Sequence, residues 1–85
     1  MKRRIITKRC GTVTVVRVDG DLRGREATEL KKICGSITAP LCLDLANLQS
    51  INAIGIETVH VLEEQGVAVV GVRPSIQRLL DRMAH

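Results

Sequence analysis

The stretch "LCLDLANLQSINAIGIETV", residues 41 to 59, decides how this chain folds. It begins with a short apolar run, 41–45, that is consistent with a strand buried on both faces. A polar corner follows at 50–52 and leads into an apolar stretch, 53–62, with helical periodicity. A strand followed directly by a helix indicates an α/β domain, and we expect a partner to bind at the corner between the two elements.

The segments before this stretch predict two strands and a helix. "RRIITKR" (3–9) and "TVTVVRV" (12–18) are rich in β-branched residues and are expected to pair antiparallel across Gly11. "DGDLRG" (19–24) is predicted to break the strand. Helical spacing then begins at Arg25, and Gly35 is a plausible C-cap.

The segments after it predict one more strand and one more helix. Gly66 is expected to end the second helix, and "VAVVGV" (67–72) is predicted to be a buried strand. Pro74 suits the first position of a third helix, in which apolar residues recur with helical spacing up to Met83.

We therefore predict a single α/β domain over residues 1–85 with the order β-β-α-β-α-β-α. Its sheet should be mixed but mainly parallel, with about four strands and with helices packed mainly on one face. The predicted core comprises Val16, Val18, Leu30, Leu43, Leu45, Leu62, Val69, Leu79 and Leu80.

The charge of the chain is uneven. Residues 1–42 hold ten Lys or Arg against four Asp or Glu, and five of these basic residues fall within the first nine positions. They are Lys2, Arg3, Arg4, Lys8 and Arg9. A patch that binds nucleic acid or an acidic membrane is one interpretation. We favour an exposed edge strand protected by its charges, because the basic residues alternate around Ile5, Ile6 and Thr7.

The remaining composition favours a reduced, cytoplasmic protein without membrane insertion. No secretory signal or membrane-spanning run is evident, and the three cysteines have no C-x-x-C spacing. Cys34 and Cys42 fall on apolar faces and are expected to be buried. Neither His60 nor His85 has metal-ligand spacing to them, so we expect no metal site and no cofactor.

Three segments carry a resemblance to a known family. "VDGDLRGREATELKK" (18–32) resembles the Gly-Glu/Asp-Leu opening of STAS domains, the anti-sigma factor antagonist family. The stretch at 41–59 is similar to the central strand and helix start of that family, and "VAVVGVRPSIQRLLDRM" (67–83) resembles the strand and helix that come next. The resemblance runs from Thr12 to Met83 and implies a minimal version of the fold.

The resemblance changes the interpretation of the corner. The serine that the family phosphorylates aligns with Ala53, the preceding Asp with Asn52, and the following Ser or Thr with Ile54; Gly55 is shared. Ala53 has no hydroxyl to accept a phosphate, so the resemblance implies that the phosphorylation switch is missing. Asn52 remains able to cap the helix.

The candidate residues favour a binding surface over a catalytic site. We expect a partner to contact the corner and the helix start through Ser50, Asn52, Ala53, Ile54, Gly55 and Glu57. A displaced phosphosite at Ser50 or Thr58 stays open as an alternative. His60, between Glu57 and Glu64, is expected to be an ordinary helix residue rather than a general base. Asp44 is expected to order the loop after its strand.

The sequence thus predicts a non-catalytic protein-interaction module in bacterial signalling and transcription regulation. By resemblance, the partner is a serine-kinase-type anti-sigma factor. The alternative is a structural STAS subunit of a stressosome-like assembly, or of an ABC transporter whose ATPase it binds. Nucleic-acid binding and a nucleotide-hydrolysing domain are less favoured, and a homodimer is left open.

Overall fold

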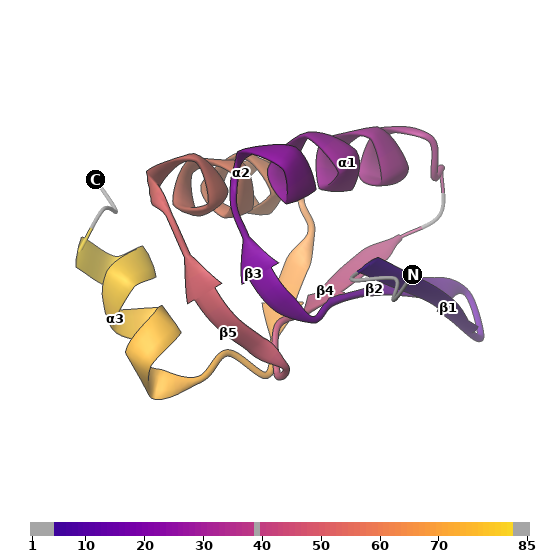
Figure 1. Ribbon diagram of the computed structural model, residues 1–85. Helices are drawn as coiled ribbons and strands as arrows, with labels where there is room; N and C mark the ends of the chain where they lie inside the picture. The colour runs from indigo at the N-terminus through magenta and orange to yellow at the C-terminus, as the bar shows by residue number, and fades with distance from the viewer. Residues whose placement is uncertain (1–4, 39, 83–85) are drawn as a thin grey trace.

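The computed structural model of this chain describes residues 5–38 and 40–82, which form six strands and three helices (Figure 1). In chain order these are β1 (Ile5–Cys10), β2 (Val13–Val18), β3 (Gly20–Leu22), α1 (Gly24–Gly35), β4 (Leu41–Asp44), β5 (Leu48–Ile51), α2 (Ala53–Glu64), β6 (Ala68–Val70) and α3 (Pro74–Arg82).

The main sheet has four strands in the order β1-β2-β4-β6. β1 and β2 are antiparallel, whereas β2–β4 and β4–β6 are parallel. The hairpin between β1 and β2 turns at Gly11, whose φ of 63° is a conformation that glycine adopts without strain. The prediction of a mixed, mainly parallel four-stranded sheet is confirmed.

Helices α1 and α2 pack against each other over one face of the sheet (Figure 1). The burial of side chains along β2 alternates as expected when helices cover one face of a sheet. Thr14, Val16 and Val18 are buried, while the residues between them are only partly covered. Of the nine predicted core residues, seven are buried. Val69, on an edge strand, and Leu79, on α3, are partly buried against the core.

Two of the strands were not predicted. β3 and β5 pair in parallel as a separate two-stranded sheet. Residues 20–22 of the predicted break and residues 50–51 of the predicted corner therefore lie in strands. A three-residue strand is too short to show a period of two, and the bonds that hold it come from a distant segment. For example, the Gly20 N–H donates to the Asn47 carbonyl at 3.0 Å.

The predictions of fully buried strands were wrong for β4 and β6. Leu43 is fully buried on β4, but its neighbour Cys42 faces the opposite side and is only partly covered. β6 is an edge strand, and Val70 is 45% exposed. Both errors have one physical cause, because helices α1 and α2 cover only one face of this sheet.

The other edge strand, β1, carries exposed Lys8 and Arg9, as predicted for a charged edge. Lys2, Arg3 and Arg4 lie outside the described residues, as do His85 and Met83.

The helix ends are partly as predicted. α2 ends before Gly66, whose φ of 96° suits glycine, and α3 begins at Pro74. The predicted C-cap at Gly35 was wrong: α1 runs through Gly35, and Ser36 caps it in a right-handed conformation. The Ser36 hydroxyl donates to the Ile33 carbonyl at 2.8 Å, which supplies a local end signal without a glycine.

Helix α3 packs against β5 and α2 (Figure 1). Ile76 and Leu80 are its buried residues. The Nε2 atom of His60, on α2, lies 3.0 Å from the Leu80 carbonyl oxygen and donates to it. His60 therefore joins two helices, a tertiary contact that its interpretation as an ordinary helix residue did not include.

Candidate functional site

The corner begins on β5, which pairs with β3. Asp21 lies opposite Ser50 and Leu22 lies opposite Ile51 in this pairing. The half-buried Ser50 hydroxyl donates a short hydrogen bond to Asp21 Oδ1. Ser50 is therefore a strand residue that ties β5 to β3, and not a loop residue presented to solvent.

Asn52 caps helix α2, as predicted. Its backbone is extended, with φ of −106°, and its side-chain Oδ1 accepts a hydrogen bond from the Gly55 N–H at 3.0 Å. This bond satisfies one of the free N–H groups of the first helical turn. Because the cap uses the side-chain oxygen of Asn52, it requires no carboxylate at this position.

Gly55 positions the start of α2 against β3. A Cβ atom at this residue would lie 2.3 Å from the Leu22 carbonyl oxygen and 2.8 Å from Ile51 Cγ1. No side chain fits there, and Gly55 itself is buried. Its contribution to the corner is the close approach of two backbones rather than direct contact with a partner.

Four of the predicted contact residues are exposed, namely Asn52, Ala53, Ile54 and Glu57. Ile54 is 52% exposed, the largest value among the exposed large apolar residues of the described chain. Ile54 lies beside the start of α1, because a Cβ atom on Gly24 would be 3.8 Å from its Cδ1. The starts of α1 and α2 thus form one continuous surface.

The charges around this surface come from both helices. Arg23 is exposed and is the N-cap residue of α1, and its backbone N–H donates to Glu26 Oε1 at 3.1 Å. Glu57 lies one turn beyond Ala53 on α2. The first turn of α2 holds no acidic side chain, so its N-terminal partial positive charge is not compensated there. We call Arg23, Gly24, Ala53, Ile54 and Glu57 the corner surface.

Thr58 faces the interior. It is 1% exposed, and its hydroxyl donates to the Ile54 carbonyl at 2.9 Å. A hydroxyl that is buried and already bonded to its own helix is inaccessible to a kinase. Of the two alternative hydroxyls, Thr58 is therefore inaccessible in this fold and Ser50 is engaged by a carboxylate.

Similarity to known proteins is found among solved structures. No family model and no curated protein matches the chain. Among solved structures, the anti-sigma factor antagonist SpoIIAA in its unphosphorylated form matches with a TM-score of 0.66 at 13% identity, over 91% of this chain and 81% of that one. The chain has a STAS-like fold.

A second match has the same fold within a much larger protein. The native form of Mglu matches with a TM-score of 0.65 at 18% identity, over 84% of this chain but only 23% of Mglu. At these identities the matches show the architecture alone. They place the STAS-like domain both in a chain of similar size and as a part of a longer one.

Asp21, Arg23 and Gly24 are residues of this STAS-like domain that sequence reasoning did not assign to the corner. Asp21 lies within the Gly-Asp-Leu motif that carried the family resemblance, and Arg23 and Gly24 follow it, so that motif was the available signal. The pairing of β3 with β5 brings the motif beside the α2 start, and no local pattern could show this pairing.

The opposite end of the STAS-like domain carries a shallow hollow of about 300 Å³. Its lining residues are Cys34, Ile37, Thr38, Pro40, Leu41, Gln65, Gly66 and Val67. Burial raises the pKa of the Cys34 thiol, so less of the reactive thiolate is present at neutral pH. With no carboxylate or imidazole among these residues, the hollow offers no acid–base chemistry.

Among residues 5–38 and 40–82, no cluster of three or more His, Cys, Asp or Glu side chains is placed to hold a metal ion. None of the described helices has the length and apolar character needed to cross a membrane. Cys34 is buried as predicted, whereas Cys42 is only partly buried.

Proposed function

We propose that this STAS-like domain is a non-catalytic, cytoplasmic protein-interaction module that acts as an anti-sigma factor antagonist and binds its partner through the corner surface. One observation carries the proposal: a half-exposed isoleucine, Ile54, occupies the first turn of α2 next to Ala53. Exposed apolar groups at a rigid, well-packed position are typical of the centre of protein interfaces.

The chemistry of the corner supports binding without a phosphorylation switch. A phosphate at this position would bring about two negative charges to a helix N-terminus. Ala53 has no oxygen to carry it, and the nearest hydroxyls, Ser50 and Thr58, are hydrogen-bonded within the domain. The contact is therefore constitutive, controlled by the amount of the protein rather than by its modification.

The proposed partner is a serine-kinase-type anti-sigma factor. The second candidate is an ABC-transporter ATPase or a stressosome-like assembly, in which the same exposed Ile54 would be buried against a different protein. Both candidate partners would bind the corner surface. Variants of this surface therefore test where the partner binds, and titration with each candidate protein tests which partner binds.

The test is a calorimetric titration of the chain with the serine-kinase-type anti-sigma factor of the same organism. Ile54→Lys places a charge where the apolar contact forms. Burying an unpaired charge costs several kcal/mol, so binding should weaken about a hundredfold. Because Ile54 is 52% exposed in the free domain, the melting temperature should stay close to that of the wild type.

Val70→Lys is the matched control. Val70 is also a large exposed apolar residue, 45% exposed, but it lies on β6 and outside the corner surface. Its substitution should leave the affinity for the anti-sigma factor unchanged. Wild-type affinity for the Ile54→Lys variant would contradict the proposed surface, and tight binding of a transporter ATPase in place of the anti-sigma factor would favour the second candidate.

A further inference from the structure

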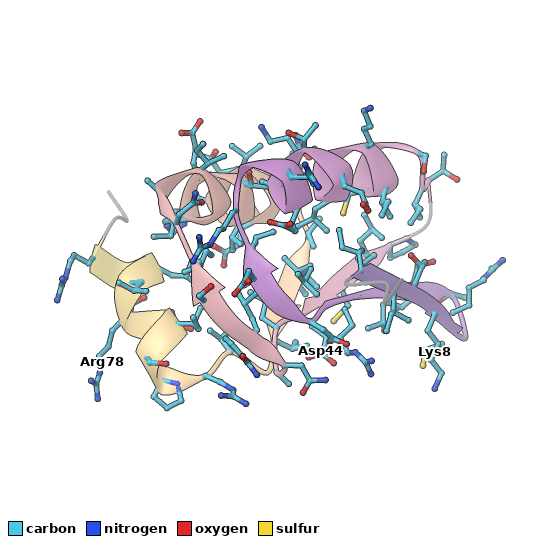
Figure 2. All side chains as sticks on the ribbon, viewed as in Figure 1. Lys8, Asp44 and Arg78 are labelled. Atoms are coloured by element: carbon cyan, nitrogen blue, oxygen red, sulfur yellow. The ribbon has the colours of Figure 1, made fainter. Side chains whose placement is uncertain are left out.

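The face of the main sheet opposite α1 and α2 is not covered by any described helix (Figure 1). Lys8 and Asp44 lie on that side in Figure 2. The strand register extends this assignment across the sheet, because Lys8 pairs with Val15, Val15 with Cys42, and Cys42 with Ala68. We call this the open face.

The next row of the open face has an unusual order of residues. Ile6 pairs with Arg17, Arg17 with Asp44, and Asp44 with Val70. Across the four strands the row therefore runs apolar, positive, negative, apolar. Ile6 is 37% exposed and Val70 is 45% exposed, so two of the three exposed large apolar residues of the described chain stand at the two ends of this row.

When a second copy is turned so that this row runs in the opposite direction, each charged residue faces the opposite charge and each apolar residue faces an apolar one. We propose that the open face binds a second copy of the chain, face to face, about a two-fold axis that runs parallel to the strands between β2 and β4. Such an axis sets Ile6 of one copy over Val70 of the other and Arg17 over Asp44, twice each. In the neighbouring row it sets Val15 over Cys42, and Lys8 at the rim over the small Ala68.

The two charged residues have hydrogen-bonding capacity left for this contact. Arg17 Nε and the Arg17 NH2 group donate to Asp19 at 2.9 and 3.1 Å, yet the Arg17 side chain is 41% exposed and a guanidinium has five donors. Asp44 Oδ1 accepts the Ala46 N–H at 2.9 Å, and a carboxylate accepts several such bonds. Sheets packed face to face lie about 10 Å apart, which side chains of this length span.

The size of the open face determines how strong the dimer is. Four strands about 4.8 Å apart give a width of about 19 Å, and the strands run for about 10–20 Å. The covered area per copy is therefore less than half of the roughly 800 Å² found in a standard interface. We expect a weak, reversible dimer with a dissociation constant on the order of 100 µM.

The experiment is sedimentation velocity of the full chain from about 10 µM to about 1 mM, a range that brackets this affinity. A thiol reductant is included, since Cys10 is exposed and Cys42 lies on the open face. Ile6→Glu and Val70→Lys are tested singly and as an equimolar mixture. Within one copy, Glu at position 6 would stand beside Arg17, and Lys at position 70 beside Asp44, so neither substitution opposes folding.

Each single variant should dimerise at least tenfold more weakly than the wild type, because each sets two charges against apolar side chains. The mixture should associate to within about threefold of the wild type, because one heterodimer pairs Glu with Lys and Ile with Val. Ile54→Lys, on α2, is the control and should dimerise normally. Circular dichroism melting of each variant verifies the fold.

Three results would overturn the proposal. The first is a wild-type chain that stays monomeric up to about 1 mM. The second is a mixture that fails to associate, which rules out the two-fold arrangement. The third is loss of the dimer in Ile54→Lys with the dimer intact in Ile6→Glu, which assigns self-association to the corner surface.

Discussion

At the scale of single residues, the corner separates residues that position it from residues that face solvent. Asn52 bonds to Gly55, Gly55 meets the Leu22 carbonyl, and Thr58 bonds to Ile54. Of the predicted set, Asn52, Ala53, Ile54 and Glu57 are exposed, and Asn52 also caps the helix. These contacts hold the start of α2 in place, so Ile54 keeps a fixed position while it is exposed.

The closest contact in this arrangement gives a stability prediction. Gly55→Ala should destabilise the domain by about 3 kcal/mol or more, because its Cβ atom would lie 2.3 Å from a backbone oxygen that cannot move without displacing β3. Urea unfolding, followed by circular dichroism, measures the free energy of unfolding.

Gly35→Ala is the control for this change. Gly35 ends α1 with nothing within 4 Å of its added Cβ atom, so the substitution should be neutral or stabilising by up to about 1 kcal/mol. Equal effects of the two substitutions would show that the approach of α2 to β3 is looser than described.

Residue roles could be predicted where they depend on near neighbours. The Asn52 cap and the bond from the Ala46 N–H to Asp44 span three residues or fewer, and both were predicted correctly. The bond between Ser50 and Asp21 spans 29 residues and was not predicted. A local pattern carries no information on a partner that arrives through tertiary folding.

At the scale of elements, α3 is the least firmly integrated of the three helices. It has nine residues, and its buried side chains are Ile76 and Leu80. The bond from His60 Nε2 to the Leu80 carbonyl satisfies one of the free acceptors of its last turn. The Nδ1 atom lies 3.4 Å from Glu63 Oε1, on the same helix as His60.

His60→Leu should therefore loosen α3 without unfolding the domain. One hydrogen bond contributes about 0.5–1.5 kcal/mol, so amide exchange across residues 74–82 should quicken several-fold. Hydrogen–deuterium exchange with mass spectrometry measures this change, while the amides of β2 and β4 should keep the wild-type rate.

Glu63→Gln separates the two contacts of the imidazole. It removes the carboxylate beside Nδ1 but leaves the bond to Leu80, so exchange in α3 should match the wild type. Faster exchange in Glu63→Gln than in His60→Leu would show that the carboxylate, rather than the carbonyl bond, holds this helix.

Elements with their own periodicity were predicted, and elements that depend on a neighbour were not. β2 is β-branched at most positions, and the apolar stretch at 53–62 exceeds two helical turns, so both signals are strong. β3 and β5 have three and four residues, and each needs the other for its backbone hydrogen bonds. Their pairing nevertheless fixes the position of the first turn of α2, because α2 follows β5 directly.

At the scale of the whole molecule, the sheet divides the surface into two sides with different chemistry. The corner surface belongs to the helices, whereas the open face lies beyond the sheet (Figure 1). The α/β class and the mixed sheet could be predicted from the order of the elements. The self-complementary row could not, because it exists only once β4 lies between β2 and β6.

Because the two surfaces lie on different sides of the domain, we expect them to act independently. Substitutions far apart and without shared partners have additive effects. At high concentration, the wild type should therefore form an assembly of two domains and two molecules of the proposed anti-sigma factor partner. The Val70→Lys variant should bind the anti-sigma factor with wild-type affinity but in a complex of one to one.

Light scattering coupled to size-exclusion chromatography gives the mass of each complex, and calorimetry gives each affinity. Ile54→Lys provides the reverse case, since it should lose the anti-sigma factor and keep the domain dimer. A Val70→Lys variant whose affinity for the anti-sigma factor falls together with its dimerisation would contradict independence. In that event one partner molecule would contact both copies of the domain, and dimerisation would be required for the partner to bind.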